Sequence, residues 1–263
     1  FFIENGFSEV INFPFTEKDE KKSILIKNPL DSNRKYMRTS LKNSLIQNLL
    51  YNERRQKDTI KIFEISDVYS RNSSISNEKK LGLIVSGRRG NNFNDFSKNL
   101  DYEYLNEILN QLHCGSLFEI IEIPRAELDS KRKEKIFYAE ITINQIPETF
   151  FNGTELSRSP INFIKYSPIS EFPSSTRDFS FSIRKPDKYN EVVNFIDNFN
   201  HENLKDSFIF DYFINPKSGE IKVGVRLIFQ STLKTLSDTE IKNAVDFILK
   251  PIMELDDVTI PGL

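Results

Sequence analysis

Apolar and polar residues alternate along the last hundred positions in a pattern that predicts β-strands. Residues 179–183, Phe-Ser-Phe-Ser-Ile, repeat with a period of two, which is typical of a half-buried strand. Apolar stretches at 207–213 and 221–230 predict two more strands, and Asn-Pro-Lys-Ser-Gly at 215–219 predicts the hairpin that joins them. We expect a short last strand at 256–260.

Two amphipathic helices fill the gaps between these strands. Apolar residues recur at helical spacing over 189–199. The second helix is predicted to begin at Ser237, because Ser237 and Glu240 have the spacing of a capping box. Its apolar stripe consists of Ile241, Ala244, Val245, Ile248 and Ile252. The order β-α-β-β-α-β predicts a ferredoxin-like sandwich.

The preceding 160 residues are less regular but also contain both kinds of element. We predict a short helix at 1–6, a strand at 10–15, a helix from 41 to 49, strands at 60–69 and 81–85, a helix at 105–112 and a strand at 136–143. The polar segment 70–80 is expected to form either a hairpin or a disordered tip. This half is therefore α+β, with a mostly antiparallel sheet. Gly, Ser and Pro interrupt the pattern at 152–160, so we predict domains at 1–159 and 160–263.

Charge and rare residues narrow the kinds of protein that fit. The chain has 263 residues and a net charge of −2. Residues 166–263 hold 11 Lys and Arg against 15 Asp and Glu, a net charge of −4, so any RNA contact there requires a local arrangement. A single cysteine, Cys114, indicates a reducing compartment, and we expect a cytoplasmic protein. His113 and His201 are isolated, which predicts no metal site, and no apolar run approaches the roughly 20 residues of a membrane span.

Three ordered groups of residues carry a family resemblance. The first is Asn-Pro-Leu at 28–30 followed by Met-Arg-Thr-Ser-Leu at 37–41, and the second is Ile-Phe-Glu-Ile at 62–65. The third consists of Phe172-Pro173-Ser174, Arg177-Asp178, Phe210-Asp211, Arg226, Phe229-Gln230 and Thr235-Leu236-Ser237-Asp238. Together they resemble the C-terminal part of bacterial phenylalanyl-tRNA synthetase beta subunits. The chain departs from that family by a short 112–138 segment and by lacking a tryptophan near 93–96.

The resemblance implies a class II synthetase-like domain that has lost catalysis, followed by a ferredoxin-fold anticodon-binding domain. Class II enzymes hold the ATP α-phosphate with an arginine near the end of one strand, where this chain has Ser70. Arg71 is the next residue along the predicted strand, so its side chain is expected on the opposite face of the sheet. The segment from Gly82 to Gly90 lacks the repeated glycines of an adenine site. We therefore expect no catalytic residues and no cofactor in this chain.

As a beta-subunit fragment, the chain is expected to serve subunit assembly and the binding of the tRNA(Phe) anticodon. The resemblance implies a catalytic alpha subunit as partner, an (αβ)₂ heterotetramer, and ATP and Mg²⁺ in the holoenzyme. The upstream beta-subunit modules, including the editing site, are expected to be absent. Two alternatives stay open, a single-chain organelle-type phenylalanyl-tRNA synthetase and a ferredoxin-like regulatory module unrelated to tRNA.

Four residues of the second domain are predicted to contact the anticodon loop. Single-stranded bases stack on aromatic rings and guanidinium planes beside a sheet. Arg226 and Ser182 point away from the apolar face of their strands, so we expect them on the open side of the sheet. Arg177 opens the first strand, and Lys234 lies before the capped helix. The simpler alternatives are an ion pair for Arg177 and a solvated loop cation for Lys234.

Charged residues of the first domain have structural and functional interpretations. Arg38 and Glu64 lie among apolar residues and are expected either to line a vestigial pocket or to form a salt bridge or subunit interface. The charge run at 53–57 predicts a solvated helix end. Arg88 and Arg89 with Lys98 are candidates for contact with the tRNA backbone.

Overall fold

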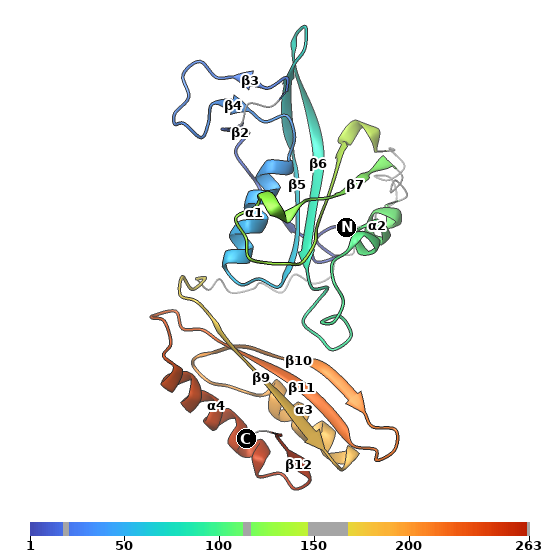
Figure 1. Ribbon diagram of the computed structural model, residues 1–263, viewed down its shortest axis with the longest axis vertical. Helices are drawn as coiled ribbons and strands as arrows, with labels where there is room; N and C mark the ends of the chain where they lie inside the picture. The colour runs from blue at the N-terminus through green and yellow to red at the C-terminus, as the bar shows by residue number, and fades with distance from the viewer. Residues whose placement is uncertain (18–20, 113–116, 147–167, 262–263) are drawn as a thin grey trace, which may run out of the picture. The chain divides into compact units, whose positions relative to one another are not determined.

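The computed structural model describes residues 1–17, 21–112, 117–146 and 168–261, which form two compact units (Figure 1). One unit comprises Phe1–Gly87 and Asn99–Pro160, and the other comprises Arg88–Lys98 and Ile161–Leu263. The predicted boundary at residues 159 and 160 lies outside the described residues, as do Cys114 and His113. The α+β class and the ferredoxin-like half of the prediction are confirmed.

The first unit is built on a five-stranded sheet with the order β1-β5-β6-β8-β7. Its strands are β1 (Ser8–Glu9), β5 (Thr59–Arg71), β6 (Ile75–Gly87), β8 (Ile136–Thr142) and β7 (Glu119–Glu122). Only the pairing of β1 with β5 is parallel among these described strands. A second, three-stranded sheet joins β2 (Phe15–Thr16), β4 (Tyr36–Met37) and β3 (Ile24–Leu25). The mostly antiparallel sheet is therefore confirmed.

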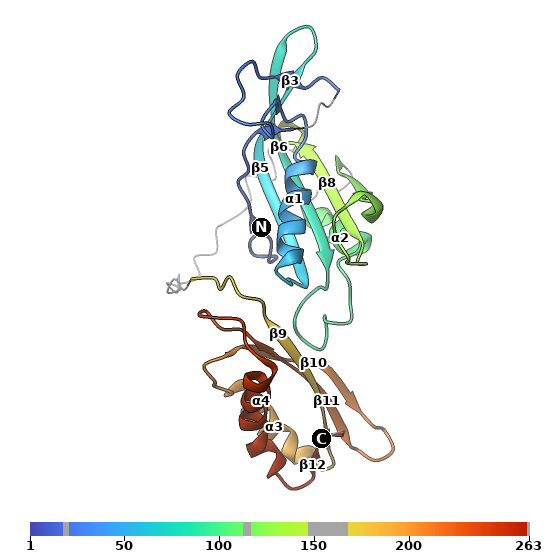
Figure 2. The same cartoon turned by 60° about the vertical axis from the view of Figure 1, so that its left-hand side comes forward.

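Two helices cover opposite faces of the large sheet. Helix α1 (Lys42–Arg54) packs Leu45 and Leu49 against Ile62 and Ile84, as Figure 2 shows for the helix and its strands. Helix α2 (Tyr102–Gln111) packs on the other face with Phe63, Leu83 and Phe137. Successive residues of a strand point to opposite faces, which explains how β5 contributes to both cores.

The predicted strand at 10–15 is wrong. The chain leaves β5 after Val10, whose N–H still donates to the Phe63 carbonyl at 2.9 Å. The backbone N–H of Asn12 donates to the Glu64 carboxylate at 3.3 Å instead of continuing the ladder. Pro14 lacks an N–H group and further disfavours a central strand here. Residues 1–6 form turns and not the predicted helix.

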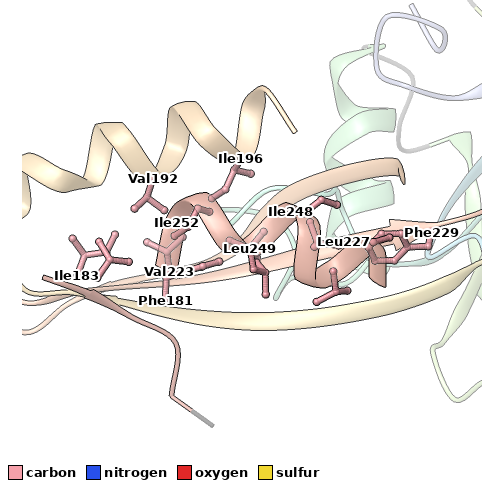
Figure 3. Close-up of a cluster of buried hydrophobic side chains, with 14 of the residues drawn as sticks. Phe181, Ile183, Val192, Ile196, Val223, Leu227, Phe229, Ile248, Leu249 and Ile252 are labelled. Carbon is pink, nitrogen blue, oxygen red and sulfur yellow. The ribbon is translucent and has the colours of Figure 1, made fainter. Parts of the chain in front are cut away.

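The second unit has the four-stranded order β10-β11-β9-β12, with all pairings antiparallel. Its elements are β9 (Ser175–Ile183), α3 (Tyr189–Asp197), β10 (Leu204–Ile214), β11 (Ile221–Phe229), α4 (Asp238–Met253) and β12 (Val258–Thr259). Both helices contribute to one core, which Figure 3 shows with Val192 and Ile196 from α3 and Ile248, Leu249 and Ile252 from α4. Both helices therefore pack on one face of the sheet, and neither covers the other face.

The predicted capping box at the start of α4 is confirmed. The Ser237 hydroxyl accepts from the Glu240 N–H at 3.3 Å, and the Glu240 carboxylate accepts from the Ser237 N–H at 2.9 Å. Hydrogen bonds from Lys234 and then from Ser237 lower the pKa of Glu240 to about 2, so this carboxylate is charged at neutral pH. The cap therefore fixes the N-terminal end of α4, which follows the loop that contains Lys234.

Candidate nucleic-acid interface on the second unit

Arg226 is the central residue of the sheet face that α3 and α4 leave uncovered. In the strand register Arg226 lies opposite Asp178 on one side and Phe208 on the other, whereas the core residues Val225 and Leu227 point the other way. The predicted location of Arg226 on the side away from the core agrees with this register. Its side chain is 18% exposed.

Two short hydrogen bonds fix the plane of the Arg226 guanidinium. Nε donates to Oδ1 of Asp178 at 2.8 Å, and Nη2 donates to Oδ2 at 2.7 Å. A bidentate pair of this kind holds the orientation of the guanidinium as well as its position. The carbon centre of the guanidinium lies 4.8 Å from the Phe96 ring centroid and 5.6 Å from that of Phe210. Arg226 is thus a positioned, planar cation among aromatic rings.

A bulge in β10 explains how Phe210 reaches this position. The register shifts between Ile209 and Asp211, so Phe210 has no direct partner on β11. Its ring lies over Gly224, where an added Cβ would come within 2.9 Å of the Phe210 ring. A side chain at position 224 would therefore displace the ring from its place beside Arg226.

Residues 88–98, which belong to this unit, complete the aromatic group. Phe96 lies 5.8 Å from Phe208 and 5.2 Å from Phe210 between ring centroids, and it is 8% exposed. Arg88 stacks on Phe96 at 4.1 Å, and its Nη1 donates to the Phe96 carbonyl at 2.7 Å. Sequence reasoning did not include Phe96, Phe208 or Phe210 in the site. The alternation of Phe208 and Phe210 with core positions was the available signal for two of them.

The other three predicted contact residues occupy different environments. Ser182 lies opposite Lys222 on the same face as Arg226, but it is only 6% exposed, and its hydroxyl donates to the Glu220 carboxylate. Arg177 lies opposite Leu227, on the face that packs against the helices, and pairs with Asp238 at 3.3 Å. The structure therefore groups Arg226 with Ser182 and places Arg177 elsewhere.

Lys234 and Arg177 both meet the first turn of α4. Lys234 forms an ion pair with Glu240, and Arg177 forms one with Asp238 two residues earlier in the helix. Arg177 thus has the ion pair that was its alternative interpretation, and Lys234 has an acidic partner. RNA contact by any of the four residues stays a prediction.

A buried ion pair joins Arg38 and Glu64 in the first unit. Nη1 of Arg38 lies 2.9 Å from Oε1 of Glu64, and the two side chains are 3% and 1% exposed. The side-chain amide of Asn12 donates to the same carboxylate at 2.9 Å. This geometry favours the salt-bridge interpretation, although Nη2 of Arg38 has no hydrogen-bond partner among the described residues.

Glu140 is the centre of a second polar cluster on the same face of the sheet. Its carboxylate accepts from Ser40 at 3.0 Å, from the Leu41 N–H at 2.8 Å, from Lys80 at 2.7 Å and from the Tyr138 hydroxyl. Burial raises the pKa of Glu140, but the hydrogen bonds from Lys80, Tyr138 and Leu41 outweigh it and hold the pKa below its ordinary value. Burial and the neighbouring Glu140 raise the pKa of Tyr138 far above its usual range. The cluster fixes the start of α1 against β6 and β8.

The positions compared with class II chemistry lie near the end of β5. The Ser70 hydroxyl lies 3.1 Å from that of Ser76 on β6, and its position in the strand places it on the face of Glu64. Arg71 is exposed and falls on the opposite face by the same alternation. Ser70 therefore occupies the position at which a class II enzyme is expected to have its phosphate-binding arginine.

The described ranges contain neither a cluster of metal ligands nor a helix that could span a membrane. Within them no group of three or more His, Cys, Asp and Glu side chains is arranged to hold a metal ion. His201 contacts the Phe247 ring, with centroids 5.9 Å apart. No described helix combines the length and the apolar character needed to cross a membrane.

Comparisons with known proteins match both units. The family described as "Phenylalanyl tRNA synthetase beta chain CLM domain" matches residues 1–137, and the "Ferredoxin-fold anticodon binding domain" matches residues 170–258. The phenylalanine–tRNA ligase beta subunit of Carboxydothermus hydrogenoformans is 25% identical over 284 residues, covering 94% of this chain and 36% of the relative. That of Francisella tularensis is 26% identical over 277 residues, covering 95% and 35%. The chain thus spans about a third of the length of these relatives.

Proposed function

Because this chain belongs to the phenylalanyl-tRNA synthetase beta chain family, we propose that it acts as part of a phenylalanine–tRNA ligase beta subunit and binds the anticodon of tRNA(Phe). The observation that carries the proposal is the Arg226 guanidinium, held in plane by Asp178 beside Phe96 and Phe210. Unpaired bases stack on aromatic rings and guanidinium planes of this kind. An anticodon base would extend the stack on the open sheet face.

We propose assembly with the alpha subunit as the role of the first unit. Support comes from large apolar side chains exposed in and around the small sheet, with Ile11 94%, Leu30 86%, Phe13 68% and Leu25 63% exposed. A group of this kind is typical of a protein–protein contact. The proposed assembly is an (αβ)₂ heterotetramer in which the alpha subunit uses ATP, Mg²⁺ and phenylalanine. A reducing, cytoplasmic location is proposed from the single cysteine.

Two assays separate this proposal from its alternatives. The chain alone is expected to show no ATP–pyrophosphate exchange, because Ser70 occupies the position of the phosphate-binding arginine of class II enzymes. Co-expressed with an alpha subunit, it is expected to elute as an αβ-type complex in size-exclusion chromatography. Exchange by the chain alone would favour the single-chain synthetase. Absence of a complex, together with no difference in gel shift between tRNA(Phe) and an anticodon-altered tRNA, would favour a regulatory module.

A further inference from the structure

Positive charge is concentrated in two short segments of the first unit. Residues 51–58 and 129–135 together hold seven Lys and Arg against four Asp and Glu, in a chain whose net charge is −2. Residues 166–263 carry a net charge of −4, so the long-range attraction that draws a polyanion to a protein must come from elsewhere in the chain. These two segments are the candidates.

A buried carboxylate brings the two segments together. Glu53 at the end of α1 is 4% exposed and accepts from Arg125 at 2.8 and 3.1 Å and from the Ser130 hydroxyl at 2.6 Å. The expectation that the whole 53–57 run is solvated is therefore wrong for Glu53. A second link joins Arg132 to Asp58 at 2.9 Å. Both links place the 129–135 loop next to the end of α1.

Two of the four acids in these segments take part in the links, whereas one of the seven cations, Arg132, does so. Arg54, Lys57, Lys131 and Lys133 are exposed, and within the described parts of the chain none of them forms an ion pair. Glu53 and Asp58, by contrast, already have arginine partners. The two segments thus form a surface with an excess of three positive charges, on which Glu53 is buried and Asp58 is paired with Arg132.

An aromatic side chain lies at the edge of this surface. The Arg55 guanidinium stacks on the Tyr51 ring, 3.4 Å from its centroid, and Tyr51 is 52% exposed. Basic residues interleaved with an exposed aromatic–guanidinium pair fit RNA better than an acidic protein, because the pair offers a surface for a base while the lysines meet phosphates.

We propose that Arg54, Arg55, Lys57, Lys131 and Lys133, with Tyr51, form a second tRNA contact that binds the sugar–phosphate backbone without reading the anticodon. The inference rests on the proposed function, since it concerns the same RNA, but it uses a different unit of the chain. The second unit would then select the tRNA, and this basic surface would supply most of the salt-dependent affinity.

The test removes four charges at the surface and four elsewhere in the chain. In complex with the alpha subunit, the variant R54Q/K57Q/K131Q/K133Q is compared with the control R71Q/K79Q/K242Q/K250Q, whose side chains are all exposed and lie on the β5–β6 hairpin and on α4. Affinities for tRNA(Phe) and for an anticodon-altered transcript are measured by fluorescence anisotropy over a range of salt concentrations.

At low salt, we expect the first variant to lose affinity by about tenfold or more. The loss should be equal for tRNA(Phe) and for the anticodon-altered transcript. The slope of the salt dependence should become shallower by about 0.9 for each phosphate that the variant no longer binds. The control should change little. Tyr51→Leu tests the base-facing part and should weaken binding about fivefold without changing the salt dependence.

Equal behaviour of the two four-residue variants would overturn the proposal, as would a defect confined to alpha-subunit assembly. Discrimination between tRNA(Phe) and the anticodon-altered transcript reports on the anticodon role separately, so the failure of one proposal can be told from the failure of the other.

Discussion

Glu64→Leu is expected to lower the free energy of unfolding of the first unit by about 3–5 kcal/mol, because it leaves the Arg38 guanidinium charged and unpaired at 3% exposure. Asn12 loses two hydrogen bonds in the same change, since both its backbone and side-chain N–H groups donate to Glu64, although its side-chain amide keeps the bond to Asn48. Few neighbouring acceptors are available to replace Glu64 as the partner of the Arg38 guanidinium. Among the described residues, Arg38 otherwise has long bonds of 3.3 Å to the Asp67 carbonyl and the Ser44 hydroxyl.

The matched control is the double variant Arg38→Met with Glu64→Leu. Replacing both partners removes the desolvated charge, so the double variant should recover at least half of the stability that the single variant loses. Native-state hydrogen exchange measures the effect in each unit, with Leu83 in the first and Val223 in the second as reporters. A double variant as unstable as Glu64→Leu would show that unpaired charge is not the cause.

Glu140→Gln should destabilise the first unit by about 2 kcal/mol at pH 7, since the carboxylate accepts from four donors and the amide cannot accept from all of them. The effect depends on pH. A carboxyl whose pKa is lower in the folded state stabilises that state above the unfolded pKa, and the contribution is lost as the pH falls through the folded value. The unfolded value here is 4.5.

The difference in stability between wild type and Glu140→Gln is therefore expected to be full above about pH 5.5 and to shrink steadily below pH 4.5. Urea unfolding across this range, monitored by the same exchange reporters, checks the direction. Glu122→Gln is the control, because its pair with Lys135 is exposed and should change stability by less than about 1 kcal/mol. A constant difference between wild type and Glu140→Gln at all pH values would contradict the assignment of charge to Glu140.

The ferredoxin-like unit could be predicted from sequence because its signals are local and agree with each other. The alternation at 179–183, the stripe of α4 and the capping box each specify one element, and the strands β9 and β11 lie where the alternation predicts them. The position of Arg226 on the open face followed from the same alternation. Where local pattern and tertiary packing coincide, the sequence is sufficient.

The first unit resisted prediction where long-range contacts override local pattern. The segment after Glu9 is apolar enough for a strand, but Asn12 donates a hydrogen bond to Glu64, which lies 52 positions away in the sequence. Glu53 lies in a charged run, but Arg125 and Ser130 bury it from more than 70 positions away. Neither partner can be identified from the spacing of nearby residues.

The candidate site was only partly predictable for the same reason. The contacts of Phe96 with Phe208 and Phe210 join positions more than 100 residues apart. Arg177 was expected among the anticodon contacts, but it lies two and four residues before Phe179 and Phe181, which face the core. The alternation of β9 therefore places Arg177 on the core face, and the sequence itself carried this signal.

The central claim, that Arg226 contacts the anticodon, is tested by measuring kcat/KM for charging in the complex with the alpha subunit. Arg226→Met keeps an apolar contact with Phe96 and Phe210 but removes the planar cation, and Arg184→Met is the control at an exposed arginine beyond the end of β9. We predict that Arg226→Met lowers kcat/KM about tenfold for tRNA(Phe) and changes it little for an anticodon-altered tRNA. An equal loss for both tRNAs, or no loss for either, would contradict the claim.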